Sequence, residues 1–212
     1  MADQRRRDKE RTRERIAQVA TVLFLERGFQ EVTVAEVAAA AGVSKVTVFA
    51  HFPRKEDLLL DRGPEALTLV RAAVRDRPPG VGPVQALRAL AVNLAEESHP
   101  LSGLTAGSRP FLRTVAASPE LISRARELLD ELEQDLGALL ASELAGAGDA
   151  ADARLLAALI IAAYRSVVTE TVRQIMKGDP LPGVAAGHRR RLDAAFDVLE
   201  TAAAPLGFGA AH

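Results

Sequence analysis

The sequence predicts an all-α protein of about nine helices, with a small N-terminal domain of three helices and a larger helical domain after it. Apolar residues recur at helical spacing along most of the 212 residues, and the breaks between these stretches carry glycine, proline or capping residues. Aromatic residues make up only 4%, and no segment convincingly predicts a strand. The expected helices cover residues 9–27, 34–41, 44–51, 55–75, 83–97, a short stretch around 111–115, 118–144, 150–177 and 185–204.

Start and stop signals define the first three helices. Gly28 follows the first apolar-periodic stretch and is a typical C-terminal cap. Thr33 and Glu36 form a Thr-x-x-Glu capping box that opens the second helix, which stops before Gly42. Ser44 can then cap the third helix. A helix, a tight glycine-containing turn and a short helix are the parts of a helix-turn-helix motif.

The third helix is too short to be stable alone, so it needs anchors. We expect Val46, Phe49 and Phe52 to hold it in a small three-helix core. Its polar residues would then point outward, and the major groove of B-DNA is wide enough to accept such a helix.

Later breaks divide the rest of the chain. Pro53 ends the motif, and a fourth helix would begin near Lys55, with a possible kink at Gly63-Pro64. Further breaks follow at Pro78-Pro79-Gly80, at 146–149 and at 178–183. We therefore expect a helix-turn-helix domain over residues 1–54 and a helical domain over 55–212, with a frayed alanine-rich tail from Thr201.

Basic residues concentrate near the N-terminus, although the net charge is only −1. We call the stretch 5–15 the basic arm; its cationic residues are Arg5, Arg6, Arg7, Lys9, Arg11, Arg13 and Arg15. A local basic segment on a nearly neutral protein favours contact with a polyanion, and a solubilising terminus is the alternative.

The stretch from Leu155 to Tyr164, LLAALIIAAY, is apolar all round. A helix of this kind must be covered on both sides, by its own core and most simply by a second copy of the chain. A central helix buried within a monomer is the alternative. The expected dimer contacts lie on the last two helices and are Ile161, Val168, Leu192, Phe196 and Leu199.

The sequence lacks the signals of metal sites, catalytic sites and membrane segments. Cysteine is absent and the four histidines are scattered, so we expect no metal and no cofactor. Neither a Ser-His-Asp order nor a glycine-rich phosphate loop stands out, so we expect no enzyme. No signal peptide or membrane span is predicted, which favours a cytoplasmic protein without membrane contact.

A ligand pocket in the second domain is a further expectation. Apolar side chains with a few polar groups line most pockets, and core packing is the alternative for each residue. The candidates are Leu94, Arg109, Phe111, Val115, Leu129 and Tyr164, with the arginine suited to an anionic ligand.

Many residues of the N-terminal quarter fall into one pattern of fixed spacing. They are Ile16, Ala20, Leu23-Phe24, Gly28-Phe29, Thr33-Val34, Val37-Ala38, Ala41-Gly42-Val43-Ser44, Thr47, His51-Phe52 and Lys55-Glu56. With them, residues 12–59 resemble the N-terminal DNA-binding domain of the tetracycline-repressor (TetR) family of transcription regulators. The resemblance implies a homodimer that binds a palindromic operator in double-stranded DNA. It also implies a repressor, released when a small-molecule effector binds the C-terminal domain.

The resemblance also assigns roles to single residues. Thr33, Thr47, His51 and Lys55 would touch phosphates. Lys45 and Val46 would lie near base edges, and Ser44, Phe49 and Ala50 complete the expected DNA-binding set.

Two departures from the family pattern leave other functions open. Phe49 stands where the family often has tyrosine, and Ala50 stands where a larger polar residue is common. The alternatives are a helical interaction protein, or a lipid- or ligand-carrying helical bundle, whose motif no longer binds DNA.

Overall fold

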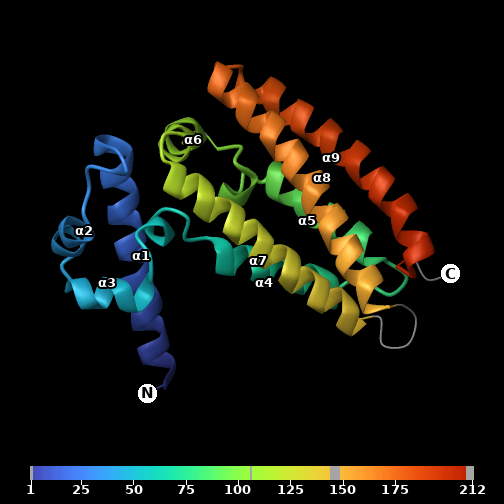
Figure 1. Cartoon of the computed structure of the whole chain (residues 1–212), viewed down its shortest axis with the longest axis horizontal. Coiled ribbons are helices and arrows are strands. Elements are labelled where there is room, and N and C mark those ends of the chain that lie inside the picture. Colours follow the sequence, from blue (N-terminus) through green and yellow to red (C-terminus); the bar gives the residue numbers. More distant parts are fainter. Residues whose placement is uncertain (1, 106, 144–148, 209–212) are drawn as a thin grey trace. The chain divides into compact units, whose positions relative to one another are not determined.

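The computed structural model describes residues 2–105, 107–143 and 149–208 and is helical throughout, with no strand among them (Figure 1). The nine α-helices of this part of the chain are α1 Ala2–Arg27, α2 Val34–Ala40, α3 Lys45–His51, α4 Gly63–Arg75, α5 Pro83–Glu96, α6 Ser108–Ala116, α7 Pro119–Glu143, α8 Ala150–Lys177 and α9 Leu181–Ala203. Three short 3₁₀ turns are η1 Glu56–Leu58, η2 Pro100–Ser102 and η3 Ala204–Leu206. The predicted all-α class is confirmed.

The chain forms two compact units. Unit 1 comprises Met1–Asp61 and Pro110–Arg126, and unit 2 comprises Arg62–Arg109 and Glu127–His212. The boundaries fall after η1 and inside α6 and α7. The functional division expected at residues 54 and 55 stays a prediction.

Unit 1 has one hydrophobic core, built from α1, α2, α3 and the segment 110–126. Phe24, Val37, Val48 and Phe52 are almost completely buried in it. Leu121, from the start of α7, is 0% exposed in the same core. The three N-terminal helices are therefore packed with a piece of chain that follows them much later in the sequence.

Unit 2 is built around α9, which packs along α8 and against α5 (Figure 1). Leu156 and Ile160 of α8 and Leu192 and Phe196 of α9 lie in its core. By length and composition α8 could cross a membrane, a property it shares with the core helices of many proteins. Its long apolar sequence is explained in part by this packing within unit 2.

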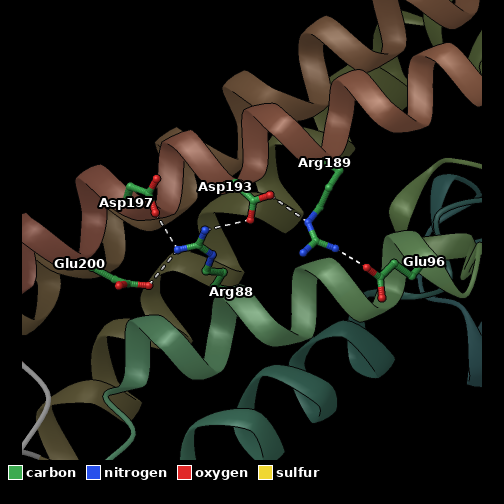
Figure 2. Close-up of polar contacts among 6 residues, drawn as sticks. All are labelled: Arg88, Glu96, Arg189, Asp193, Asp197 and Glu200. Carbon is green, nitrogen blue, oxygen red and sulfur yellow. Dashed lines mark hydrogen bonds and ion pairs between the residues drawn. The ribbon is translucent and has the colours of Figure 1, made fainter.

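A network of ion pairs fastens α5 to α9 (Figure 2). Arg88 of α5 donates to Asp193 at 2.9 Å and to Asp197 at 2.7 Å, and lies 3.4 Å from Glu200. The hydrogen bond from Arg88 is the main reason that the pKa of Asp193 is lowered. Arg189, on α9, extends the network by pairing with Asp193 and with Glu96.

The fourth helix begins later than predicted. Residues after Lys55 form η1, and α4 starts at Gly63. Pro64 occupies the first turn of α4 and does not kink a longer helix, because proline fits a position whose N–H has no partner inside the helix.

The ends of the chain also differ from the expectation. Helix α1 begins at Ala2, so the basic arm is helical. Of the tail expected to fray from Thr201, residues 201–208 form helix and a turn, and Phe208 is 4% exposed and packs in the unit 2 core. The N–H of Phe208 donates to the carbonyl of Ala203 at 3.0 Å, after Gly207 has reversed the chain with a φ of 84°. Residues 209–212 of this tail lie outside the described part of the chain.

Candidate nucleic-acid interface

The turn between α2 and α3 is fixed by a pair of backbone hydrogen bonds. The N–H of Gly42 donates to the carbonyl of Ala39 at 3.1 Å, and that of Val43 donates to Ala38 at 3.0 Å. Together with the φ of +63° at Gly42, this is a Schellman cap, which a residue with a Cβ would strain. The chain turns by 102° between the two helices. The predicted helix-turn-helix is confirmed.

Capping side chains hold the start of each of these helices. Thr33 accepts from the N–H of Glu36 at 3.2 Å, and Glu36 accepts from the N–H of Thr33 at 2.8 Å, so the capping box is present. That backbone hydrogen bond, with Arg27 beside it, lowers the pKa of Glu36 to about 2. Ser44 accepts from the N–H of Thr47 at 3.0 Å, and their hydroxyls lie 2.8 Å apart. The hydroxyls of Thr33, Ser44 and Thr47 therefore order the motif.

The residues that anchor helix α3 to the core differ in part from those predicted. Val48 is 0% exposed and Phe52 is 1% exposed, one helical turn apart. Val46 is 79% exposed and Phe49 is 43% exposed, so their predicted role as core anchors is wrong. Successive residues of a helix are 100° apart, so a helix anchored through Val48 and Phe52 must direct Val46 and Phe49 elsewhere.

We call the outward side of α3 the α3 outer face. Its exposed residues are Lys45, Val46, Phe49 and Ala50. The ammonium of Lys45 lies 5.8 Å from the centroid of the Phe49 ring, within range of a cation–π contact. The face therefore presents one cation and an apolar surface, all from consecutive turns of one helix.

Lys55 is turned into unit 1. Its ammonium donates to the carbonyl of Phe29 at 2.6 Å and lies 4.3 Å from the centroid of the Phe29 ring. Burial lowers the pKa of Lys55. An ammonium has three donors, so this arrangement leaves capacity for a phosphate, and the predicted phosphate contact stays a prediction.

His51 lies at the end of α3, close to cations from α1. Its Nδ1 is buried and has no hydrogen-bond partner within the described part of the chain. Burial lowers the pKa of His51, and the charges of Lys9 and Arg13 lower it further. The guanidinium of Arg13 stacks 4.7 Å from the ring of Phe52 and donates to the carbonyl of Asp61 at 2.9 Å. Two residues of the basic arm thus lie beside α3, which sequence spacing alone did not reveal.

Most of the basic arm is exposed along the first turns of α1. Arg5, Lys9 and Arg13 are spaced by four residues and share one face of the helix. Because Lys9 and Arg13 act on His51, this face is the one directed towards the end of α3. Lys9 and Arg13 therefore bring positive charge to the C-terminal end of α3, and Lys45 brings a further cation to its first turn.

Comparison with known sequences agrees with this geometry. Residues 16–69, which contain the whole helix-turn-helix, match the family described as bacterial regulatory proteins, tetR family. Its helix-turn-helix domain is of the TetR type. The transcriptional regulator TcmR of Streptomyces glaucescens is 30% identical over 141 residues, which cover 65% of this chain and 62% of TcmR. The chain thus matches less than two thirds of the length of that relative.

Other relatives match over more of the chain. The nucleoid occlusion factor SlmA of Escherichia coli O1:K1 / APEC is 25% identical over 186 residues, or 85% of this chain and 92% of SlmA. Among solved structures, a TetR-family regulator from Mesorhizobium loti has a TM-score of 0.53 at 17% identity, covering 90% of this chain and 97% of that one. NalD of Pseudomonas aeruginosa has a TM-score of 0.52 at 21% identity, covering 90% and 96%. These two structures show that the TetR fold extends through unit 2.

The six predicted pocket residues do not come together in one unit. Phe111 and Val115 belong to unit 1 and pack against its core. Leu94, Arg109, Leu129 and Tyr164 belong to unit 2, where burial raises the pKa of Tyr164. A surface hollow of about 340 Å³ in unit 2 is lined by α8 alone, at Ala162, Arg165, Ser166, Thr169, Glu170 and Arg173. This hollow contains none of the predicted residues, so the ligand site stays a prediction.

Four of the five predicted dimer contacts are buried inside the single chain, and this assignment is wrong. Ile161, Leu192, Phe196 and Leu199 are each 6% exposed or less, and the last three lie in the unit 2 core. Val168 is half-buried. The large apolar residues that these two helices do expose are Leu155, Leu159 and Val198, at 49%, 38% and 68%.

Proposed function

We propose that this chain is a TetR-family regulator and acts as a cytoplasmic repressor of transcription with no catalytic activity. In this proposal it binds a palindromic operator as a homodimer and releases it when a small-molecule effector binds. The observation that carries the DNA-binding part is the α3 outer face. Helix α3 is anchored through Val48 and Phe52 and directs Lys45, Val46 and Phe49 away from the core. A short helix held in this way has the dimensions to enter the major groove.

Cations near the motif support binding to a polyanion. Lys9 and Arg13 lie beside the end of α3, and Arg5 continues their line along α1. Arginine and lysine side chains bind phosphates without reading sequence, and they supply affinity that falls as salt rises. In the proposed complex the basic arm therefore contributes affinity, and α3 contributes sequence preference.

A dimer would supply the second reading helix. Operators of helix-turn-helix proteins place half-sites about 34–36 Å apart, and one chain carries one such helix. We infer that the dimer forms through the exposed apolar side chains of α8 and α9, namely Leu155, Leu159 and Val198. These residues replace the buried set predicted from the sequence.

Release by an effector and the repressor role rest on family resemblance. TcmR is a transcriptional regulator, and NalD is a repressor of a multidrug efflux pump. The predicted pocket residues, Arg109 among them, remain candidates for effector contacts.

The test is binding of the full chain to the DNA immediately upstream of its own coding sequence. DNase I footprinting should show protection of two half-sites related by a two-fold axis. A deletion of residues 2–8, which removes three of the seven arm cations, should weaken binding and lower its salt dependence without changing the melting temperature. Binding no tighter than to random DNA would favour an interaction protein or a ligand-carrying bundle instead.

A further inference from the structure

The chemistry of the α3 outer face is unusually apolar for a surface expected to read bases. Val46 is 79% exposed and Phe49 is 43% exposed, and Ala50 beside them is exposed too. Lys45 is the one residue of the face whose side chain carries a hydrogen-bonding group. Ser44, at the start of the helix, has its hydroxyl engaged by the N–H and the hydroxyl of Thr47.

Helix α3 does not need Val46 and Phe49 to hold it in place, because other residues anchor it to the core. Val48 and Phe52 are almost completely buried and fill the side that faces the core. Val46, at 79% exposure, gains little from unit 1, and Phe49 still leaves 43% of its surface exposed, so both forgo part of the free energy of apolar burial. Such residues on a surface that carries a function indicate contact with an apolar group of a partner.

The major groove offers one such group. Arginine or lysine reads guanine, asparagine or glutamine reads adenine, and a carboxylate reads cytosine, whereas thymine alone presents a methyl group, at C5. The α3 outer face has no amide and no carboxylate, so it lacks the usual readers of adenine and cytosine.

We propose that the α3 outer face selects DNA by the C5-methyl groups of thymines, which pack on Val46 and Phe49, with Lys45 as the one side chain able to read a base by hydrogen bonds. This proposal rests on the proposed function, since it needs α3 in the major groove. Lys45 lies 5.8 Å from the centroid of the Phe49 ring, so the cation and the ring occupy one patch. Lys9 and Arg13 add positive charge near the end of the helix, which favours nucleic acid over an apolar protein partner.

The experiment replaces thymine by uracil, which removes the methyl group and keeps the base pair. Duplexes preferred by the full-length protein are first selected from a random-sequence library. Each thymine of the preferred duplex is then replaced in turn by uracil, and Kd is measured by fluorescence anisotropy. We expect the replacement to weaken binding about fourfold for each methyl that the face contacts.

Variants assign the effect to residues. At one or more of the sensitive positions, Phe49→Ala or Val46→Ala should bind the thymine duplex and the uracil duplex with equal affinity, because the surface that packs on the methyl group is gone. Lys45→Ala is the matched control: it should weaken binding but keep the thymine-to-uracil ratio. Thermal melting checks each variant. All three side chains are exposed, so the substitutions should leave folding unaffected.

The outcomes separate the two claims. Sequence-specific binding in which no uracil replacement matters would overturn methyl reading and leave the proposed function in place. A uracil effect that survives in both Phe49→Ala and Val46→Ala would overturn the assignment to this face. No preference for any duplex over bulk DNA would remove the proposed function itself.

Discussion

Asp57 and Arg124 form an ion pair of 2.8 Å inside unit 1, although 67 positions separate them in the sequence. Their side chains are only 16% and 13% exposed. Asp57 lies in η1, directly after the helix-turn-helix, and Arg124 lies in the first half of α7. The pair therefore fastens the DNA-binding motif to a helix that continues into the other unit.

Arg124→Ala should destabilise unit 1, because the largely buried Asp57 carboxylate loses its ion pair with Arg124 and keeps the N–H of Arg54 at 3.3 Å. We expect a loss of about 3 kcal/mol in the free energy of unfolding, measured with urea. Arg126→Ala, an exposed position on the same helix, is the control and should change stability by less than about 0.5 kcal/mol. Equal losses for the two variants would show that the ion pair has no special role.

Lys55→Ala should affect both stability and DNA binding. It removes the hydrogen bond to the carbonyl of Phe29 and the contact with the Phe29 ring, so we expect a loss of about 1 kcal/mol in unfolding free energy. If the other two donors reach a phosphate, the salt slope of binding should also fall by about 1. Lys45→Ala serves as the stability control because its side chain is exposed. An unchanged salt slope would leave Lys55 with a structural role only.

Acid should destabilise unit 2 through His188. This residue is 0% exposed, its Nδ1 lies 2.8 Å from the hydroxyl of Thr171, and its Nε2 is buried with no hydrogen-bond partner in the described ranges. Burial, helped by Arg191, lowers the pKa of His188 from 6.5 to about 4. Between these values the unfolded chain binds more protons than the folded one, so stability present above pH 6.5 is lost as pH falls towards about 4.

The measurement is the melting temperature as a function of pH for the wild type and for His188→Gln. The variant should be less stable overall but should show a flatter decline in this window. Glu36, whose pKa is lowered from 4.5 to about 2, loses its contribution only at lower pH, so the two effects are separable. Parallel curves for the two proteins would mean that His188 does not cause the decline.

The dimer should depend on exposed residues of α8 and α9 and not on buried ones. Leu155→Asp and Val198→Asp should each give monomers in analytical ultracentrifugation and lose operator binding, with the melting temperature of the chain little changed by the substitution itself. Phe196→Asp should instead unfold unit 2, because it buries a charge in the core at a cost of several kcal/mol. If Leu155→Asp and Val198→Asp both stay folded and fully dimeric, the interface lies elsewhere.

Local signals in the sequence predicted much of the fold correctly. The Thr33 and Glu36 capping box, the Gly42 turn and the bounds of α8 all follow from residues within one or two turns of each other. Such caps act through adjacent backbone groups, so their effect can be read without knowing the rest of the molecule.

What the sequence did not reveal depends on three-dimensional packing. Helix α3 has only seven residues, and its apolar residues Val46, Val48 and Phe49 point in different directions around the helix axis. Hydrophobic periodicity therefore could not tell which of them face the core. The pairing of Asp57 with Arg124 and the approach of Lys9 to His51 join separate segments, and no spacing rule predicts them. Burial of Phe196 against neighbours from the same chain was mistaken for a partner contact for the same reason.

The central claim is that the α3 outer face meets DNA, and one pair of variants tests it most directly. Val46→Asp places a carboxylate at the most exposed apolar position of the face, and Val22→Asp makes the same change at a 53% exposed position of α1. Val22 lies nine residues after Arg13, which puts it on the opposite side of that helix. In anisotropy titrations with the upstream DNA, Val46→Asp should lose about a hundredfold in affinity through repulsion from phosphates and bases, at an unchanged melting temperature. Val22→Asp should bind like the wild type, whereas equal affinity for Val46→Asp and the wild type would contradict the account.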